Sequence, residues 1–184
     1  MLYDTKEFKL RDGRTGVLKH PGDEEAQALL DYLVKSASET EFLLRYPEEW
    51  QRFTLEGEKR HLAGMKESGN DVFLTCMVDG KVAGNCHLMM NDSIKTRHRA
   101  NIAIALLKEY WGLGIGTFMF QEVMKGGKEA RPDLMQVELE VAEPNERGLA
   151  LYKKMGFVEY GKRENALKCK DGTLMAEVLM MKKL

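Results

Sequence analysis

The chain has 184 residues, with 28 Lys and Arg against 29 Asp and Glu, and a formal net charge of −1 at pH 7. Apolar residues make up 43% and charged residues 31%, the balance of a folded globular protein rather than a disordered one. This near-neutral charge gives no electrostatic basis for binding nucleic acid or an anionic membrane. The length predicts a single domain over residues 1–184.

The N-terminal residues and the cysteines indicate the cellular compartment of the protein. The N-terminus, Met1–Asp4, does not show the basic start and following apolar segment of a secretory signal. No apolar run approaches the roughly 20 residues that a bilayer span needs. Neither the cysteines nor three of the histidines have the spacing of a disulfide framework or a metal site. These residues are Cys76, Cys86, Cys169, His20, His61 and His87. We therefore expect a cytoplasmic protein without a metal.

The first half of the chain predicts a hairpin, two helices and a second hairpin. Lys6–Lys19 has the pattern of a short strand or hairpin, and the apolar positions of residues 26–34 recur at helical spacing. A weaker helical pattern covers Trp50–Met65. Val72–Val78 and Val82–Met90 are β-rich runs separated by a short Asp-Gly turn, which predicts a hairpin.

The second half predicts alternating strands and helices. Asn101–Leu107 is apolar nearly throughout, which predicts a strand buried on both faces. An amphipathic helix follows a glycine-rich loop, and we expect it to end at Gly126-Gly127. A strand, a short helix and a final strand are then predicted over Leu134–Val141, Asn145–Met155 and Leu174–Met181. Together these elements predict a mixed α/β sheet with helices on its faces.

The glycine-rich loop, Trp111 to Thr117, lies between a predicted strand and a predicted helix. Alternate glycines leave the backbone bare, so several N–H groups can converge on one anion at the positive end of the helix. A Walker loop would need a lysine that the chain lacks here, and a dinucleotide fingerprint would need glycine where Thr117 stands. The loop therefore predicts a diphosphate site, with a plain strand-to-helix turn as the alternative.

Two segments, Trp111–Gly116 and Asn145–Phe157, together resemble the GNAT superfamily of acyl-CoA N-acyltransferases. The first is similar to the family loop Q/R-x-x-G-x-G/A and departs from it at Trp111. The second is similar to N-x-x-A-x-x-L-Y-x-K-x-G-F and departs from it at Gly148. The resemblance covers nearly the whole chain. It implies a single GNAT-like domain with a mixed, mostly antiparallel sheet, flanked by helices, whose central strands splay to admit coenzyme A.

The resemblance also implies a reaction and a site. An acetyl group passes from acetyl-CoA directly to a primary amine of a small molecule or peptide, while pantetheine inserts between the two central strands. Tyr152 falls where the family commonly has its general acid, although it also lies on an apolar helix face typical of a core tyrosine. Asn145 is also a candidate N-cap. The residues expected to bind the cosubstrate are Leu106, Leu107, Trp111, Gly112, Leu113, Gly114, Ile115, Gly116, Thr117 and Asn145.

The general base stays open at this point. Many family members hold a carboxylate near the start of the strand before the glycine loop, where this chain has Asn101. Glu138 and Glu140 share one face of the next predicted strand, and His98 has a suitable unperturbed pKa of about 6.5. Each of these is also consistent with a solvated surface residue. Ordered water is the remaining candidate.

The acceptor and two rival functions also stay open. Residues 39–58 carry six glutamates against two arginines, which favours a cationic acceptor or marks a solvated acidic face. A non-catalytic module that binds or senses acyl-CoA is the main alternative to a transferase. A scaffold that has lost its ligand is the second. A homodimer is possible, and the sequence does not decide the oligomeric state or the acyl chain.

Overall fold

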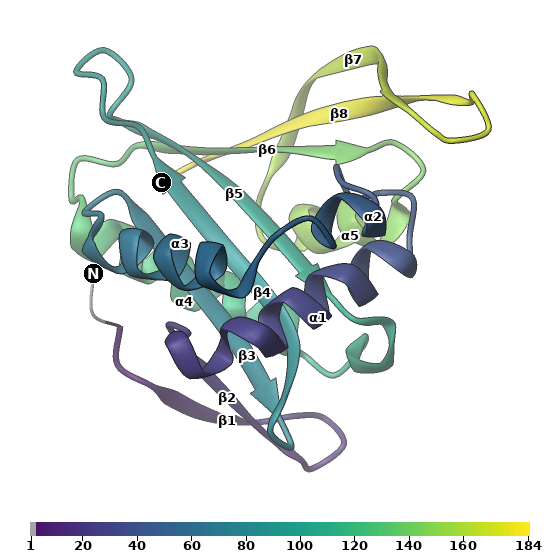
Figure 1. Cartoon of the computed structure of the whole chain (residues 1–184). Coiled ribbons are helices and arrows are strands. Elements are labelled where there is room, and N and C mark those ends of the chain that lie inside the picture. Colours follow the sequence, from purple (N-terminus) through teal and green to yellow (C-terminus); the bar gives the residue numbers. More distant parts are fainter. Residues whose placement is uncertain (1–2) are drawn as a thin grey trace.

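The computed structural model describes residues 3–184. Their strands form one eight-stranded sheet in the order β1-β2-β3-β4-β5-β6-β8-β7, antiparallel except between β5 and β6 (Figure 1). The strands are β1 (Lys6–Lys9), β2 (Thr15–Lys19), β3 (Asp71–Val78), β4 (Lys81–Met90), β5 (Arg99–Leu106), β6 (Gln136–Ala142), β7 (Val158–Lys168) and β8 (Leu174–Lys183). The α-helices are α1 (Ala26–Ser38), α2 (Pro47–Trp50), α3 (Leu55–Glu67), α4 (Ile115–Ala130) and α5 (Glu146–Lys154). The mixed α/β fold predicted from the sequence is confirmed.

The helices form a layer on each face of the sheet (Figure 1). The hydroxyl of Tyr32 on α1 reaches Asn85 of β4, whereas α4 packs against Leu88 of the same strand. Because successive side chains of a strand point to opposite faces, α1 and α4 lie on opposite sides of the sheet. The first three helices thus cover one face, and α4 with α5 covers the other.

The weak helical pattern over Trp50–Met65 corresponds to α3, and it meets the short helix α2 only at Trp50, where α2 ends. Thr54 breaks the pattern because its side-chain oxygen accepts a 3.1 Å hydrogen bond from the backbone N–H of Gly57 and so caps α3. The strand β7 was not predicted. Most of its side chains are exposed, so the strand shows no apolar alternation that would reveal it.

The predicted end of α4 at Gly126-Gly127 is wrong, because the helix continues to Ala130. A Cβ on Gly127 would lie 2.2 Å from Cδ2 of Leu88, and one on Gly126 would lie 3.2 Å from Cγ1 of Val72. The two glycines therefore bring the helix close to β3 and β4 instead of ending it.

The prediction that β5 is buried on both faces is also wrong. Ala100 and Ile102 are buried, but Asn101 and Ala103 are exposed on the opposite face. This strand pairs with β6 only through Arg99–Asn101, and beyond that point the two strands diverge. The face of β5 that carries Asn101 and Ala103 is not covered along this part of the strand. The divergence agrees with the expected splay of the central strands.

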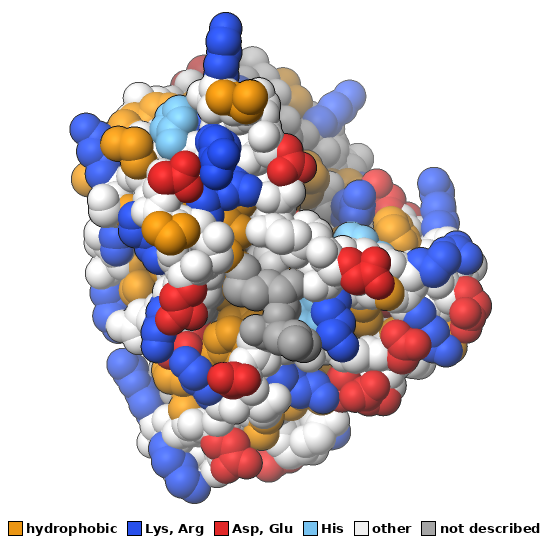
Figure 2. Space-filling model, turned by 90° about the vertical axis from the view of Figure 1, so that its left-hand side faces the viewer, with side chains coloured by type: hydrophobic (Ala, Val, Ile, Leu, Met, Phe, Trp, Pro, Cys, Tyr) orange, Lys and Arg blue, Asp and Glu red, His pale blue; other side chains and the backbone are white. Residues whose placement is uncertain are grey.

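The surface of the protein mixes charges of both signs. On the face drawn in Figure 2, Lys and Arg side chains alternate with Asp and Glu, and neither sign covers a continuous area. Such a surface matches a formal net charge of −1. Within residues 3–184, no helix is both long enough and apolar enough to cross a membrane.

Candidate active site

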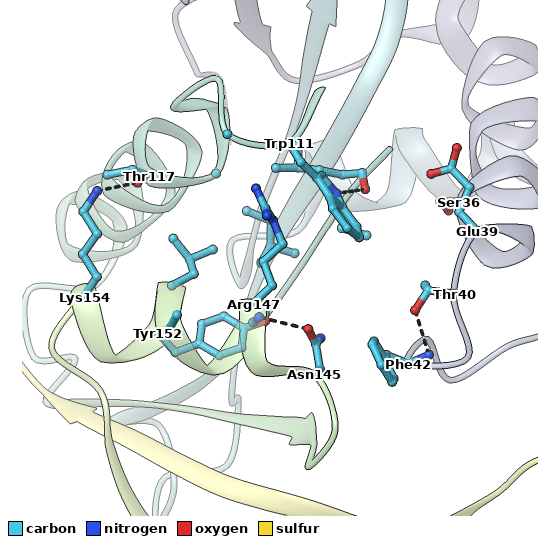
Figure 3. Close-up of a pocket in the computed structure, with 18 of the residues that line it drawn as sticks. Ser36, Glu39, Thr40, Phe42, Trp111, Thr117, Asn145, Arg147, Tyr152 and Lys154 are labelled. Carbon is cyan, nitrogen blue, oxygen red and sulfur yellow. Dashed lines mark hydrogen bonds between the residues drawn. The ribbon is translucent and has the colours of Figure 1, made fainter. Parts of the chain in front are cut away.

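A cavity of about 420 Å³ opens beside the diverging strands. Its walls come from the end of β5, the glycine-rich loop with the start of α4, one side of α5 along its length, and the end of α1 with the connection to α2. Arg11, between β1 and β2, completes the lining. Figure 3 shows α4 and α5 on one side of this space and the α1–α2 connection on the other. The cavity thus joins the two segments that carry the sequence signatures to a part of the chain with no recognised motif.

The glycine-rich loop presents its backbone donors to this cavity. Gly112 and Gly114 adopt left-handed conformations, with φ of +80° and +93°. Arg11 forms two hydrogen bonds with the loop. Its side chain donates to the carbonyl of Gly112 at 3.2 Å, and its backbone N–H donates to the carbonyl of Leu113 at 3.2 Å. Within the described chain, the six amide groups of residues 112–117 have no hydrogen-bond acceptor. They lie at the positive end of α4, which is a site suited to an anion.

Three cations surround the same end of the cavity. Arg147 places its guanidinium 4.8 Å from the centre of the Trp111 ring, and Lys154 donates to the hydroxyl of Thr117 at 3.3 Å. Arg11 is the third. None of them forms an ion pair with a carboxylate of residues 3–184, so their charge is available to a ligand. Six free amides and three unpaired cations fit the diphosphate of a coenzyme A thioester.

The end of β5 already takes part in hydrogen bonds that cross the cavity wall. The carbonyl of Leu106 accepts a 2.9 Å bond from the indole N–H of Trp111, which lies in the middle of the view in Figure 3. The carbonyl of Ala105 accepts a 2.8 Å bond from the Tyr32 hydroxyl on the other face.

The structure brings most of the predicted site residues together. Eight of them line the cavity: Leu106, Trp111, Gly112, Gly114, Gly116, Thr117, Asn145 and Tyr152. The side chains of Leu107 and Ile115 are buried in the core, and Leu113 packs against it. These three residues do not line the cavity.

Tyr152 both packs in the core and lines the cavity. Its ring packs in the core 6.0 Å from the ring of Phe120 and 6.2 Å from that of Phe157, measured between centroids. It also lines the cavity, and its hydroxyl has no hydrogen-bond partner among residues 3–184. Burial raises the pKa of this phenol, so the side chain is protonated at neutral pH.

Asn145 begins α5 as its N-cap. Its side-chain oxygen accepts a 2.9 Å hydrogen bond from the backbone N–H of Gly148. A Cβ on Gly148 would lie 2.8 Å from Nδ2 of Asn145, so alanine at this position would require the Asn145 side chain to shift. The predicted N-cap role is confirmed. Because Asn145 also lines the cavity, its amide N–H₂ group remains available to a ligand.

The three side chains considered as general base lie outside the cavity. Glu138 accepts from Arg99 at 3.1 Å, and Glu140 accepts from Arg163 at 2.9 Å. Neither glutamate lines the cavity, and neither does His98. Glu39 does line the cavity, although the sequence did not single it out as a site residue. The only sequence signal for Glu39 was its membership of the acidic segment 39–58.

The residues of the described chain offer no group of three or more His, Cys, Asp or Glu side chains arranged to hold a metal ion. The groups in the cavity that can act on a ligand include its backbone donors, its three cations, Tyr152 and Glu39.

The comparisons with known proteins identify the family. A splayed sheet with a bare glycine loop at a helix start defines a class of proteins that bind acyl-coenzyme A. Residues 27–157 match the model of the acetyltransferase (GNAT) family, and the chain belongs to that family. The fold resembles an acetyltransferase of the GNAT family from Streptococcus pneumoniae, with a TM-score of 0.85 and 24% identity over 92% of this chain and 99% of that one.

Two other relatives carry more specific names. A ribosomal-protein-alanine N-acetyltransferase from Brucella melitensis has a TM-score of 0.78 and 20% identity over 91% of this chain and 99% of its own. An N-alpha-acetyltransferase of Sulfurisphaera tokodaii is 45% identical over 58 residues. That segment is 32% of this chain and 34% of the relative, so the match spans about a third of its length.

Proposed function

We propose that this protein transfers an acetyl group from acetyl-CoA to a primary amine by direct attack in a ternary complex. One observation carries the proposal: six free amides, three unpaired cations and the splayed end of β5 open into one cavity with Tyr152. This combination matches a ligand with a diphosphate at one end and a narrow amide-bearing arm. The yncA protein of Salmonella typhimurium, solved with its cofactor acetyl-CoA, has the same fold at a TM-score of 0.77.

Each wall of the cavity has a separate task in this proposal. The amides of residues 112–117 and the Arg147 guanidinium bind the diphosphate. The backbone of β5 beyond Asn101 pairs with the pantetheine arm in place of β6. Acetyl-CoA then supplies the activated acetyl group as a thioester.

The reaction needs proton transfers at the amine nitrogen and at the sulfur. The amine first loses a proton to water in the cavity, because an ammonium group has no lone pair. Its nitrogen then forms a bond to the acetyl carbon while the bond from that carbon to sulfur breaks, and the nitrogen loses its second proton to water as the neutral amide forms. Tyr152 gives its proton to the departing thiolate. Burial raises the pKa of the phenol and so weakens it as an acid, and the transfer therefore depends on the same burial raising the proton affinity of the thiolate. The phenol regains a proton from solvent.

A peptide N-terminus is the first acceptor to test. The names of two relatives, N-alpha-acetyltransferase and ribosomal-protein-alanine N-acetyltransferase, refer to α-amines of proteins. A small-molecule amine is the other class within the same proposal. We place the enzyme in the cytoplasm because its three cysteines are unpaired.

A module that binds acyl-CoA without turnover is the second candidate. It is favoured by one observation, that none of Glu138, Glu140 and His98 lines the cavity. Binding alone would give the same response to acetyl-CoA, so the two functions differ only in whether the thioester is consumed.

The experiment has two stages. Thermal unfolding is measured with acetyl-CoA and, as a control, with NADH; a ligand at 100 times its dissociation constant adds about 2.7 kcal/mol of stability. Free thiol is then followed with a panel of amines. A shift with acetyl-CoA alone and amine-dependent thiol release support the transferase. A shift without thiol release supports the binding module, and no shift overturns both.

A further inference from the structure

The cavity is electrically polarised. Its three cations, Arg11, Arg147 and Lys154, lie around the glycine-rich loop and α5. Of the described residues that line it, Glu39 alone has a carboxylate. Figure 3 shows Glu39 on the α1–α2 side of the space, opposite Lys154 and Tyr152. One end of the cavity thus suits phosphates, and the other end suits a cation.

The carboxylate of Glu39 is held in place but not neutralised. Oxygen Oε2 accepts a 2.7 Å hydrogen bond from the backbone N–H of Lys108, just beyond the end of β5. Its nearest lysine along the helix, Lys35, instead pairs with Glu109 at 2.5 Å. Glu39 forms no ion pair with a cation of residues 3–184, and its oxygen Oε1 has no donor there. The side chain therefore keeps both its charge and a free acceptor.

Apolar side chains adjoin this carboxylate. Thr40 accepts a 3.2 Å hydrogen bond from the backbone N–H of Phe42, and this turn brings Phe42 and Leu43 into the cavity wall. Beyond the connection, Glu48 of α2 forms an exposed 2.7 Å ion pair with Lys170, between β7 and β8. The wall beside Glu39 thus combines apolar side chains with one negative charge.

We infer that Glu39 binds the ammonium group of the acceptor and so selects a cationic primary amine with an apolar group next to it. This inference rests on the proposed function. The bond from Lys108 holds the carboxylate beside the end of β5, where the thioester is expected. Phosphates at the cationic end and an ammonium at Glu39 are each repelled from the other end, so the two substrates enter in one orientation.

The test compares Glu39→Gln with the wild type. The glutamine oxygen still accepts from Lys108 N–H, so the fold and the cavity shape are kept while the charge is removed. Glu41→Gln is the matched control, because Glu41 lies two residues further on and does not line the cavity. The acceptors are tripeptides with free N-termini, spermidine and cadaverine, and the best of them is used for full kinetics with free thiol as readout.

We expect Glu39→Gln to raise the KM for the acceptor about tenfold or more and to leave the KM for acetyl-CoA and the Tm unchanged. Glu41→Gln should match the wild type. A second readout isolates the charge: inhibition by the same acceptor with a hydroxyl in place of its amine should be equal in wild type and Glu39→Gln.

Three results overturn the inference. The first is an unchanged acceptor KM in Glu39→Gln. The second is an equal loss for acetyl-CoA and acceptor, or a lower Tm, which would mean a structural role. The third is a wild type that binds acetyl-CoA but acetylates no amine. That last result removes the proposed function itself, whereas the first two leave it standing.

Discussion

The indole N–H of Trp111 donates a 2.9 Å hydrogen bond to the carbonyl oxygen of Leu106, the last residue of β5. A ligand that pairs with β5 as an added strand needs the backbone carbonyls of that strand. The Trp111 side chain is only partly exposed, at 37%, and Arg147 lies over its ring. Binding of acetyl-CoA along β5 therefore requires the indole to leave Leu106 or to share its carbonyl.

We predict that the fluorescence of Trp111 changes when acetyl-CoA binds. The chain has two tryptophans, so Trp50→Phe gives a protein in which Trp111 is the only one. Its emission should change saturably with acetyl-CoA and stay constant with NADH. Unchanged emission at a concentration that raises the Tm would show that the indole keeps its bond to Leu106.

Arg147→Gln should weaken the binding of acetyl-CoA about tenfold. The variant removes one of the three unpaired cations next to the glycine-rich loop, and charge-assisted hydrogen bonds to phosphate are among the stronger polar interactions. Lys153→Gln is the control, because this residue of α5 loses the same charge outside the cavity. The dissociation constants are measured by calorimetry. Equal losses in both variants would mean that only the overall charge matters.

Tyr152→Phe should lower kcat about a hundredfold while leaving the Tm unchanged. General acid catalysis contributes about this much, and the hydroxyl that is removed has no hydrogen-bond partner in the part of the chain described. If Tyr152 only packs in the core, the variant keeps the wild-type kcat.

The pH dependence of kcat is a second test of Tyr152. Because burial raises the pKa of Tyr152 above its ordinary value near 10, the phenol stays protonated as the pH rises to that value. The wild-type kcat should therefore show no loss from ionisation of Tyr152 between pH 7 and pH 10. A basic-side decline that disappears in Tyr152→Phe would contradict this expectation.

Gly84→Ala should destabilise the protein by about 1–3 kcal/mol, as overpacking in a core does. A Cβ at Gly84 of β4 would lie 2.5 Å from the carbonyl oxygen of Ala105 and 2.2 Å from Cδ2 of Leu106. Because these atoms belong to β5, the displacement should also weaken acetyl-CoA binding. The free energy of unfolding is measured by denaturant titration.

Gly64→Ala is the matched control for that experiment. Gly64 lies within α3, and a Cβ there meets no atom within 4 Å. Alanine should therefore stabilise the helix by about 0.5–1 kcal/mol. A stable Gly84→Ala variant with wild-type affinity would mean that β4 and β5 can move apart at no cost.

The fold was predictable from the sequence wherever burial left a periodic signal. Helices α1 and α4 and the β3–β4 hairpin show their apolar patterns directly. The strand β7 does not, because its side chains are mostly exposed, and the length of α4 was missed because Gly126 and Gly127 serve close packing rather than termination. Local pattern cannot separate these two uses of glycine.

The candidate site also has a part that the sequence predicts and a part that it does not. The glycine-rich loop and Asn145–Tyr152 are contiguous segments, so their spacing is visible in the chain. Glu39 reaches the cavity because it caps the C-terminal end of α1, which lies beside Lys108, 69 residues further along the chain. No short-range pattern records that contact, and the sequence instead drew attention to Glu138 and Glu140, which are held by arginines.

Because β5 pairs with β6 only as far as Asn101, the backbone donors and acceptors that β5 directs away from β4 have no strand beside them from there on. On the outside of a protein such an open strand edge invites aggregation, because any other extended chain can dock on it. Here the open edge lies in the wall of a cavity, where α5 and the α1–α2 connection limit the width of what can enter. An edge that would promote aggregation on the surface is thus placed where a narrow extended ligand can pair with it.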